Sequence, residues 1–315
     1  MAAEIDMTND RANIAFVGDV PWHGLGQELT EDASIETWKV EAGMNWKIEE
    51  SPIILGNTQV KYDGKKALYR GDTNTPLSIV SERYQVVQPE QVIEFFRDLT
   101  NDLGMKLNTA GCLFGGKRFW ALADTGMAGK ILGNDEVKGK LLLTSSCDGV
   151  TATVAQFTSV RVVCNNTLSL ALNDTKATKA RVLHSQIFSP EAIKQNLGLM
   201  ADSWDNFMAS ITKLSEVEFS EKQAREFVTK LFMYDRVEKL STRTLNQVEE
   251  IVDLSYTGMG SEMARGTLWG TLNGVTEYFD HHSNTRVADT ALWNSWYGGA
   301  ANTKSRAFEN AMALI

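Results

Sequence analysis

The feature that most constrains this fold is a run of short apolar and β-branched stretches between residues 106 and 172, separated by brief turns. Stretches of this composition are typical of strands: Phe119–Leu122, Gly139–Thr144, Thr151–Phe157 and Val160–Cys164. Strands joined by turns pair antiparallel, because a parallel pair needs a crossover of a dozen residues or more. The sequence therefore predicts an antiparallel β-meander, with Asp148-Gly149 as one of its turns.

Strands and helices are mixed before this region. We expect strands at Trp46–Glu49, Leu77–Val80 and Tyr84–Val87, a hairpin at Gln59–Tyr69 that turns at Asp63-Gly64, and helices at Glu31–Ala42 and Pro89–Leu103. In the second helix Val92, Phe95, Phe96 and Leu99 share one face, and Gly104 follows its end.

The pattern becomes helical near residue 189. Ser189-Pro190 resembles an N-cap followed by proline, and Ser220 is a second candidate cap. Helical spacing continues through Thr242–Tyr256 and Gly266–Phe279. The sequence thus predicts an α+β fold in two domains: an α+β core at 1–188 with a β-rich centre at 106–188, and a helical domain at 189–315.

Composition predicts a folded protein of the cytoplasm. Hydrophobic residues make up 43% and charged residues 23% of 315 positions, which are ordinary globular values. No stretch of about 18 apolar residues predicts a membrane helix, and the acidic start lacks the basic and apolar segments of a secretory signal. Three cysteines without CxxC spacing fit reduced thiols in a host cytoplasm.

The net charge of −9 is unevenly distributed along the chain. Residues 1–100 carry 9 basic and 17 acidic side chains, residues 101–190 carry 10 and 6, and residues 191–315 carry 12 and 17. The middle third is therefore a basic segment of net +4 in an acidic chain. A local positive field attracts phosphates even when the total charge is negative, although an excess of this size also arises by chance.

No catalytic motif stands out. Residues 111–118 match GxxxxGK, but Arg118 replaces the Ser or Thr that binds Mg²⁺, and an expected strand follows instead of a helix. A hairpin turn at Gly115-Gly116 fits better. Neither Cys147 nor Cys164 lies in a nucleophile signature. We therefore expect a protein that is not an enzyme and needs no cofactor.

Histidines near one expected helix end raise the question of a metal site. Glu277, Asp280, His281 and His282 are close in sequence but match no metal-binding spacing. Histidines also stabilise helix C-termini through the helix dipole. We expect no metal here, and a catalytic role for His281 and His282 is the least favoured hypothesis.

The basic segment carries the residues that we predict to contact DNA: Lys117, Arg118, Trp120, Lys138, Lys140, Phe157, Arg161, Asn165 and Asn166. Cations that neutralise phosphates and aromatic rings that stack on bases are the chemistry of single-strand binding. The aromatic residues are equally expected as core of the sheet, since strand aromatics usually pack inward. The asparagines either contact phosphate oxygens or form a turn.

Four segments carry a family resemblance: residues 4–8, Pro21–Gly26, Ser81–Gln88 and Arg161–Thr167. Together they resemble the phage/plasmid-like protein family, a domain of unknown function found on mobile elements. The order of a helix, a meander with basic residues and then further helices is also similar to phage single-strand annealing proteins of the Redβ, RecT and Erf type. That second likeness concerns architecture and implies a ring or filament of identical chains on DNA.

These observations lead to one functional hypothesis and one alternative. We expect an oligomeric single-stranded DNA-binding protein that promotes annealing in phage or plasmid recombination without ATP. The alternative is a protein–protein interaction module of a mobile element, such as an inhibitor of host defence, in which the acidic surface mimics DNA.

Overall fold

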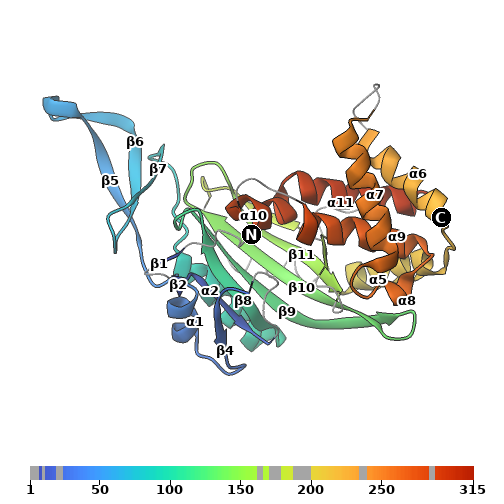
Figure 1. Cartoon of the computed structure of the whole chain (residues 1–315). Coiled ribbons are helices and arrows are strands. Elements are labelled where there is room, and N and C mark those ends of the chain that lie inside the picture. The colour runs from blue at the N-terminus through green and yellow to red at the C-terminus, as the bar shows by residue number, and fades with distance from the viewer. Residues whose placement is uncertain are drawn as a thin grey trace. The chain divides into compact units, whose positions relative to one another are not determined.

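The computed structural model describes residues 7–8, 11–18, 24–161, 166–169, 179–186, 200–233, 240–283 and 288–315 (Figure 1). Strands dominate the first part and helices the last, which confirms the predicted α+β class. The chain divides into two compact units that differ from the predicted linear division. The first comprises residues 1–126, 141–156 and 179–198, and the second comprises residues 127–140, 157–178 and 199–315.

An eight-stranded sheet runs through the described chain in the order β12-β11-β10-β9-β8-β3-β4, with β13 also paired to β11. Its strands are β3 (Ile14–Val17), β4 (Gln27–Leu29), β8 (Lys106–Leu113), β9 (Arg118–Ile131), β10 (Asp135–Ser146), β11 (Thr153–Arg161), β12 (Asn166–Ser169) and β13 (Lys179–Val182). The succession from β8 to β12 is the predicted antiparallel meander.

The turn between β8 and β9 confirms the expected hairpin at the GxxxxGK match. Gly111 pairs with Trp120 and Leu113 with Arg118, so the chain reverses over Phe114–Lys117. Gly115 and Gly116 both adopt positive φ, which glycine allows without steric cost. Because a strand follows this turn, no helix N-terminus is present to hold a phosphate.

Two strand predictions are wrong, one in the meander region and one before it. Thr151–Phe157 and Val160–Cys164 were expected as separate strands, but residues 153–161 form the single strand β11. Residues 84–87 lie in an irregular segment instead of a strand. A side chain of this segment contacts the main sheet instead, because the Tyr84 hydroxyl donates a hydrogen bond to the carbonyl oxygen of Ser146 in β10.

A separate three-stranded sheet consists of β5 (Ile48–Leu55), β6 (Val60–Arg70) and β7 (Pro76–Ser81), in that order. The hairpin predicted to turn at Asp63-Gly64 is incorrect, since the chain turns through the short helix η1 (Gly56–Thr58). Asp63-Gly64 instead lies in a bulge, because Ile54 pairs with Lys61 and Pro52 with Lys66. The Asp-Gly pair therefore bends a strand without ending it.

Helices α1 (Ile35–Glu41) and α2 (Pro89–Leu103) complete the first unit, together with the two-stranded pair β1 (Met7–Thr8) and β2 (Arg11–Ala12). The predicted apolar face of α2 is buried: Val92, Phe95, Phe96 and Leu99 are each at most 1% exposed. Gly104 has φ of +68° directly after α2, as expected for a glycine that ends a helix.

The second unit is mainly helical. It contains α5 (Met200–Glu216), α6 (Glu221–Met233), α7 (Thr242–Thr257), α8 (Ser261–Ala264), α9 (Leu268–Glu277), the π-helical turn η2 (Tyr278–His282), α10 (Ala288–Tyr297) and α11 (Gly299–Met312). The Ser220 hydroxyl accepts the amide of Gln223 at 3.4 Å, so the predicted cap of α6 is confirmed. The expected cap at Ser189-Pro190 lies outside the described residues.

Helix α9 is almost wholly buried because two glycines bring its backbone close to its neighbours. A Cβ atom at Gly274 would lie 2.7 Å from the carbonyl oxygen of Ile251 in α7. Helix α9 also packs on α5 and α11. Beneath these helices, the indole nitrogen of Trp269 donates to Asp135 of β10 at 3.1 Å, and the side chain of Asp135 is buried.

Candidate nucleic-acid interface

The loop between β10 and β11 is organised by one carboxylate. Asp148 Oδ1 accepts the backbone amides of Val150 and Thr151, both at 2.8 Å, and the hydroxyl of Ser146 at 2.9 Å. Its Oδ2 accepts the Thr151 hydroxyl at 2.9 Å and Arg118 Nε at 2.8 Å. Burial alone raises the pKa of Asp148, but these hydrogen bonds outweigh it and hold the pKa below 3.8.

Tyr84 anchors the irregular segment 82–88 to this loop. Its hydroxyl donates to the Ser146 carbonyl at 2.9 Å, and the ring is 9% exposed. Burial, together with the nearby Cys147 and Asp148, raises the pKa of Tyr84 well above its ordinary value. Tyr84 is therefore a neutral hydrogen-bond donor with a fixed ring position.

Cys147 is buried in the same wall. It is 1% exposed, and its thiol points to the carbonyl oxygens of Gly116 and Lys117. Burial first, and then the charge of Asp148, raises the pKa of Cys147 to about 12. Since thiol reactivity depends on the thiolate, this result agrees with the absence of a nucleophile signature around Cys147.

His184 completes an aromatic pair with Tyr84. The two rings are stacked, with centroids 4.4 Å apart and planes at 17°. His184 Nδ1 lies 3.0 Å from the carbonyl oxygen of Gln85, and the Gln85 amide donates back to the His184 carbonyl at 2.5 Å. Burial lowers the pKa of His184, so the ring is uncharged at neutral pH and Nδ1 donates its proton to Gln85.

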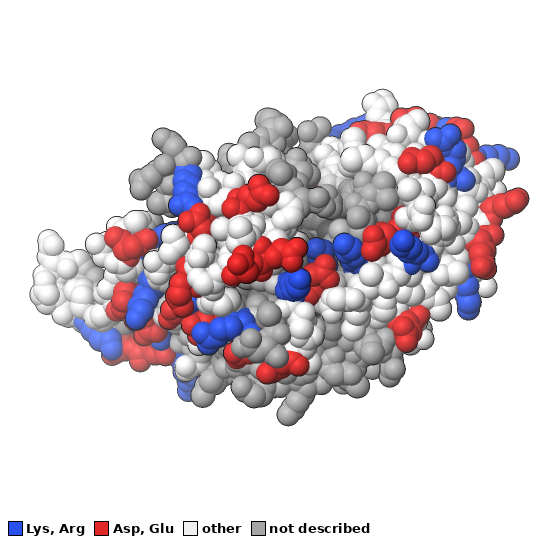
Figure 2. Space-filling model, turned by 90° about the horizontal axis from the view of Figure 1, so that it is seen from below, with Lys and Arg blue, Asp and Glu red and all other residues white. Residues whose placement is uncertain are grey.

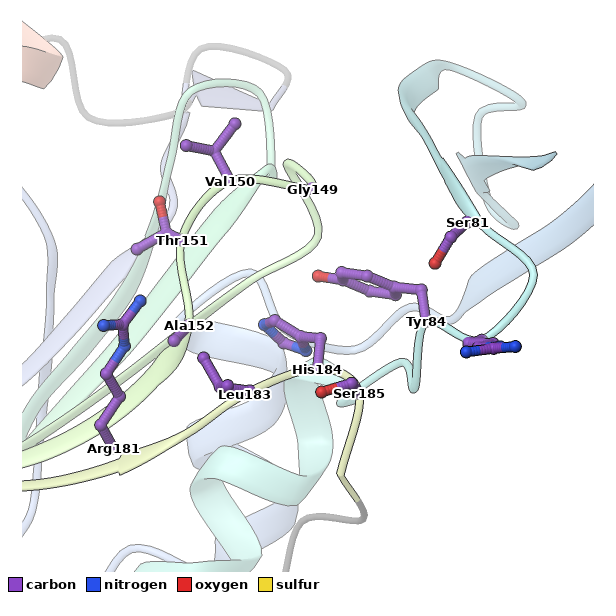
Figure 3. Close-up of a pocket in the computed structure, with 11 residues that line it drawn as sticks. Ser81, Tyr84, Gly149, Val150, Thr151, Ala152, Arg181, Leu183, His184 and Ser185 are labelled. Carbon is purple, nitrogen blue, oxygen red and sulfur yellow. The ribbon is translucent and has the colours of Figure 1, made fainter. Parts of the chain in front are cut away.

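These groups border a hollow of about 180 Å³, lined by residues 81, 83–84, 149–152, 181 and 183–185. Figure 3 shows the Tyr84 and His184 rings between Ser81 on one side and Thr151 and Arg181 on the other. Arg83 and Arg181 are its only charged lining residues, and both are exposed. Within the described part of the chain, neither guanidinium forms an ion pair, so the hollow carries two uncompensated positive charges.

The two predicted cations nearest this hollow in the first unit behave differently. Arg118 forms an ion pair with Asp148, and its guanidinium lies 4.7 Å from the Phe114 ring centroid. Its side chain is only 22% exposed, so Arg118 mainly holds the loop in place. Lys117, in the β8–β9 turn, is half-buried and forms no ion pair among the described residues, so its ammonium group stays available for a phosphate.

Four further predicted residues do not line this hollow: Lys138, Lys140 and Phe157 of the second unit, and Trp120 of the first. Lys138 and Lys140 lie two residues apart on β10; Lys138 is half-buried and Lys140 is 9% exposed. The aromatic candidates are core residues, because Trp120 is 3% exposed and Phe157 is 4% exposed. Rings buried to this extent have no free face for a base.

Three predicted positions are described only in part. Arg161 and Asn166 are paired across β11 and β12, and their side chains lie outside the described part of the structure. Asn165 lies entirely outside the described residues.

The surface charge is mixed. On the face seen in Figure 2, Lys and Arg are interspersed with Asp and Glu among the coloured atoms, and they do not gather in one continuous positive band. Elsewhere in the described part of the chain several cations are paired, including Lys106 with Glu31 at 3.0 Å and Lys61 with Glu82 at 3.1 Å.

The histidines near the end of α9 do not assemble a metal centre. His282 lies 3.8 Å from Glu277 and 3.7 Å from Glu250. No group of three or more His, Cys, Asp or Glu among the described residues is arranged to bind a metal ion. Asp280 instead accepts from the buried Lys304 ammonium at 2.5 Å, which makes it part of a structural ion pair.

No described helix is long and apolar enough to cross a bilayer.

Sequence reasoning did not assemble the hollow. Arg83 and Tyr84 lie in the segment Ser81–Gln88 that carries the family resemblance, and this was their only signal. Arg181 lies in the basic segment, and Arg181 and His184 lie about 100 residues further along the chain. The two segments are brought together by the pairing of β13 with β11 and by the contacts of His184 with Tyr84 and Gln85.

The fold and the hollow define an α+β protein with a small, positively charged site of aromatic and backbone groups. The chain belongs to the family described as "Domain of unknown function (DUF932)", whose model matches residues 76–296. This match includes every residue that lines the hollow. No curated protein and no solved structure matches the chain significantly.

Proposed function

We propose that this chain is a single-stranded DNA-binding protein that promotes annealing during phage or plasmid recombination, without ATP and as a homo-oligomer. The observation that carries the proposal is the hollow, where unpaired Arg83 and Arg181 flank the stacked rings of Tyr84 and His184. Its membership of a phage or plasmid element rests on the resemblance of the four sequence segments described above.

The chemistry of the hollow suits a nucleotide. Guanidinium groups bind phosphate oxygens with two parallel hydrogen bonds, and the stacked Tyr84 and His184 rings form an uncharged wall beside the two arginines. The residues that line the hollow include no carboxylate, and the nearby Asp148 carboxylate is bound to Arg118. Lys117 in the adjacent turn is a further cation of the same unit.

The size of the hollow supports action by several copies. A volume of about 180 Å³ accommodates part of one nucleotide and not a longer segment of DNA. One chain therefore contributes few phosphate contacts, and a few contacts give weak binding at physiological salt. Several identical chains on one strand multiply these contacts, which is the advantage of an oligomer.

The proposal is tested by titrating a labelled 30-nucleotide single strand with protein across a salt series and measuring fluorescence anisotropy. Single-stranded DNA releases about 0.7 counterion per neutralised phosphate. Replacement of Arg83 and Arg181 by alanine should therefore reduce the slope of log K against log salt by about 1.4 per chain. Both side chains are exposed, so the fold should remain intact.

Arg97→Ala is the matched control. Arg97 is an exposed arginine on α2 in the same unit and does not line the hollow, so Arg97→Ala removes one positive charge outside it, where the double variant removes two inside it. Binding of wild-type protein that weakens with salt, and that depends on the two arginines but not on Arg97, supports the proposal. Absence of binding at low salt overturns it and favours the alternative, a protein–protein interaction module.

A further inference from the structure

The sheet of β5, β6 and β7, called here the β-arm, has two chemically different faces. Side chains alternate between the faces along each strand, and directly paired residues share a face. Leu55 pairs with Val60, and Ser51, Ala67 and Ile79 are aligned across the three strands. Ile53 lies between Ser51 and Leu55 in this alternation, so one face, called the outer face, carries Ile53, Leu55, Val60 and Ile79.

The outer face exposes four large apolar or aromatic side chains, although Lys65, which pairs with Ser81, also lies on it. Leu55 is 46% exposed, Val60 54% and Ile79 64%; Tyr62, two residues after Val60, is 49% exposed. Figure 1 shows β5 and β6 extending away from α1 and α2 of their own unit. Neither of these two helices therefore packs on the distal part of the β-arm.

The opposite face has the reverse character. Near the base it buries Ile48, Leu68 and Val80, each less than 5% exposed. It also carries Lys66, which bonds Glu50 at 2.8 Å, and Lys61, which bonds Glu82 at 3.1 Å. Both of these ion pairs of the β-arm lie on this face, where Ile54 is the exposed apolar residue toward the tip.

An exposed apolar sheet face is a site of association with another molecule. The net charge of the strands that carry this face indicates which partner is compatible. The three strands carry four basic and three acidic residues, a net of +1, in a chain of net −9. Two copies of an acidic chain repel each other through most of their surface. The β-arm is a place where they can meet without that repulsion.

The edges of the β-arm favour association through its face. Pro52 lies in edge strand β5 and Pro76 begins edge strand β7. Proline has no amide proton for a new ladder, so these residues oppose strand addition at either edge. Contact between two outer faces needs no backbone hydrogen bonds and buries the exposed side chains of both copies.

The area available is sufficient for a symmetric dimer. The exposed parts of Leu55, Val60, Tyr62 and Ile79 amount to roughly 400 Å² per copy, given typical side-chain areas. Two copies then bury roughly 800 Å² of apolar surface. Since apolar atoms form only about 57% of an average interface, the whole contact is roughly 1,400 Å², within the standard range.

We propose that the outer face of the β-arm packs against the outer face of a second copy of the same chain, with twofold symmetry. The proposal deepens the homo-oligomer of the proposed function by assigning the surface that joins two chains. The association itself needs no DNA, so it can be tested separately from DNA binding.

The experiment is sedimentation velocity of the purified full chain over a wide concentration range without nucleic acid. Leu55→Lys places a charge in the outer face of both copies and should weaken the dimer by about 100-fold or more. Ile54→Lys is the matched control, because Ile54 is 43% exposed but pairs with Lys61 on the opposite face. It should change the dimer dissociation constant by less than about threefold.

Circular dichroism spectra and melting temperatures, measured at a concentration where the chain is monomeric, establish that both variants are folded. A wild-type dimer that Leu55→Lys dissociates and Ile54→Lys preserves supports the proposal. A wild-type chain that remains monomeric at the highest concentration, or equal effects of the two variants, overturns it. Arg83 and Arg181 are absent from the outer face, so their variant should form the same dimer as wild type. Loss of DNA binding in that variant with an intact dimer supports separate surfaces for DNA binding and for dimer formation.

Discussion

Replacement of Asp148 by asparagine tests the organisation of the hollow most directly. The carboxylate accepts five hydrogen bonds, from two backbone amides, two hydroxyls and Arg118. Asparagine has nearly the same shape but only one side-chain oxygen. Its NH₂ group would take the place of the other carboxylate oxygen and would face hydrogen-bond donors such as Arg118. The substitution therefore removes the charge and leaves part of this donor set without an acceptor.

The cost follows from these contacts. Arg118 and Asp148 are 22% and 11% exposed, so their ion pair is largely shielded from water. Breaking a buried pair by removing one partner costs about 3–5 kcal/mol, and a hydrogen bond to a charged group contributes about 1.5–3 kcal/mol. Because asparagine retains the hydrogen bonds to one oxygen, we expect the free energy that stabilises this loop to decrease by about 3 kcal/mol.

Native-state hydrogen exchange measures this loss at the site. The amides of Val150 and Thr151 donate to Asp148, and their exchange should be faster by on the order of 100-fold in Asp148→Asn. Asp63→Asn is the control, because Asp63 is exposed in the bulge of β6. Exchange within about threefold of wild type at Val150 and Thr151 would refute the argument.

The pH dependence of this contribution has a definite sign. The folded-state pKa of Asp148 lies below its ordinary value of 3.8, so unfolding takes up protons in acid. The stabilisation is fully present above pH 3.8 and is lost as pH falls through the folded-state pKa. The difference between wild type and Asp148→Asn should be equal at about pH 7 and pH 5 and decrease only below about pH 4.

Three further predictions concern other parts of the chain. Lys304→Ala leaves the buried Asp280 carboxylate unpaired and should destabilise the helical unit by about 3–5 kcal/mol in urea unfolding, with partial recovery when Asp280→Asn is added. Gly274→Ala places a Cβ 2.7 Å from the Ile251 carbonyl oxygen and should cost about 1–3 kcal/mol; unchanged stability would contradict the close crossing of α7 and α9. Cys147, with its pKa raised to about 12 by burial, should resist iodoacetamide at neutral pH and react only in denaturant, as peptide mapping will show.

The local elements of this protein follow largely from its sequence. The apolar spacing of α2, Gly104 after it, and the Gly115-Gly116 turn were predicted because each depends on neighbouring residues. The antiparallel meander follows for the same reason, since brief turns leave no length for a crossover. The Asp63-Gly64 turn is the exception, because the same residue pair also fits a bulge when the paired strand continues past it.

The site and the association surface were decided by tertiary structure. Tyr84 meets His184 because the chain returns along β13 about 100 residues later, and no local pattern encodes that return. Arg118 was predicted as a phosphate contact, but Asp148, 30 residues away, pairs with it. Composition and local spacing determine which residues can form an element; which charges remain unpaired and which apolar faces remain uncovered depend on contacts between distant segments.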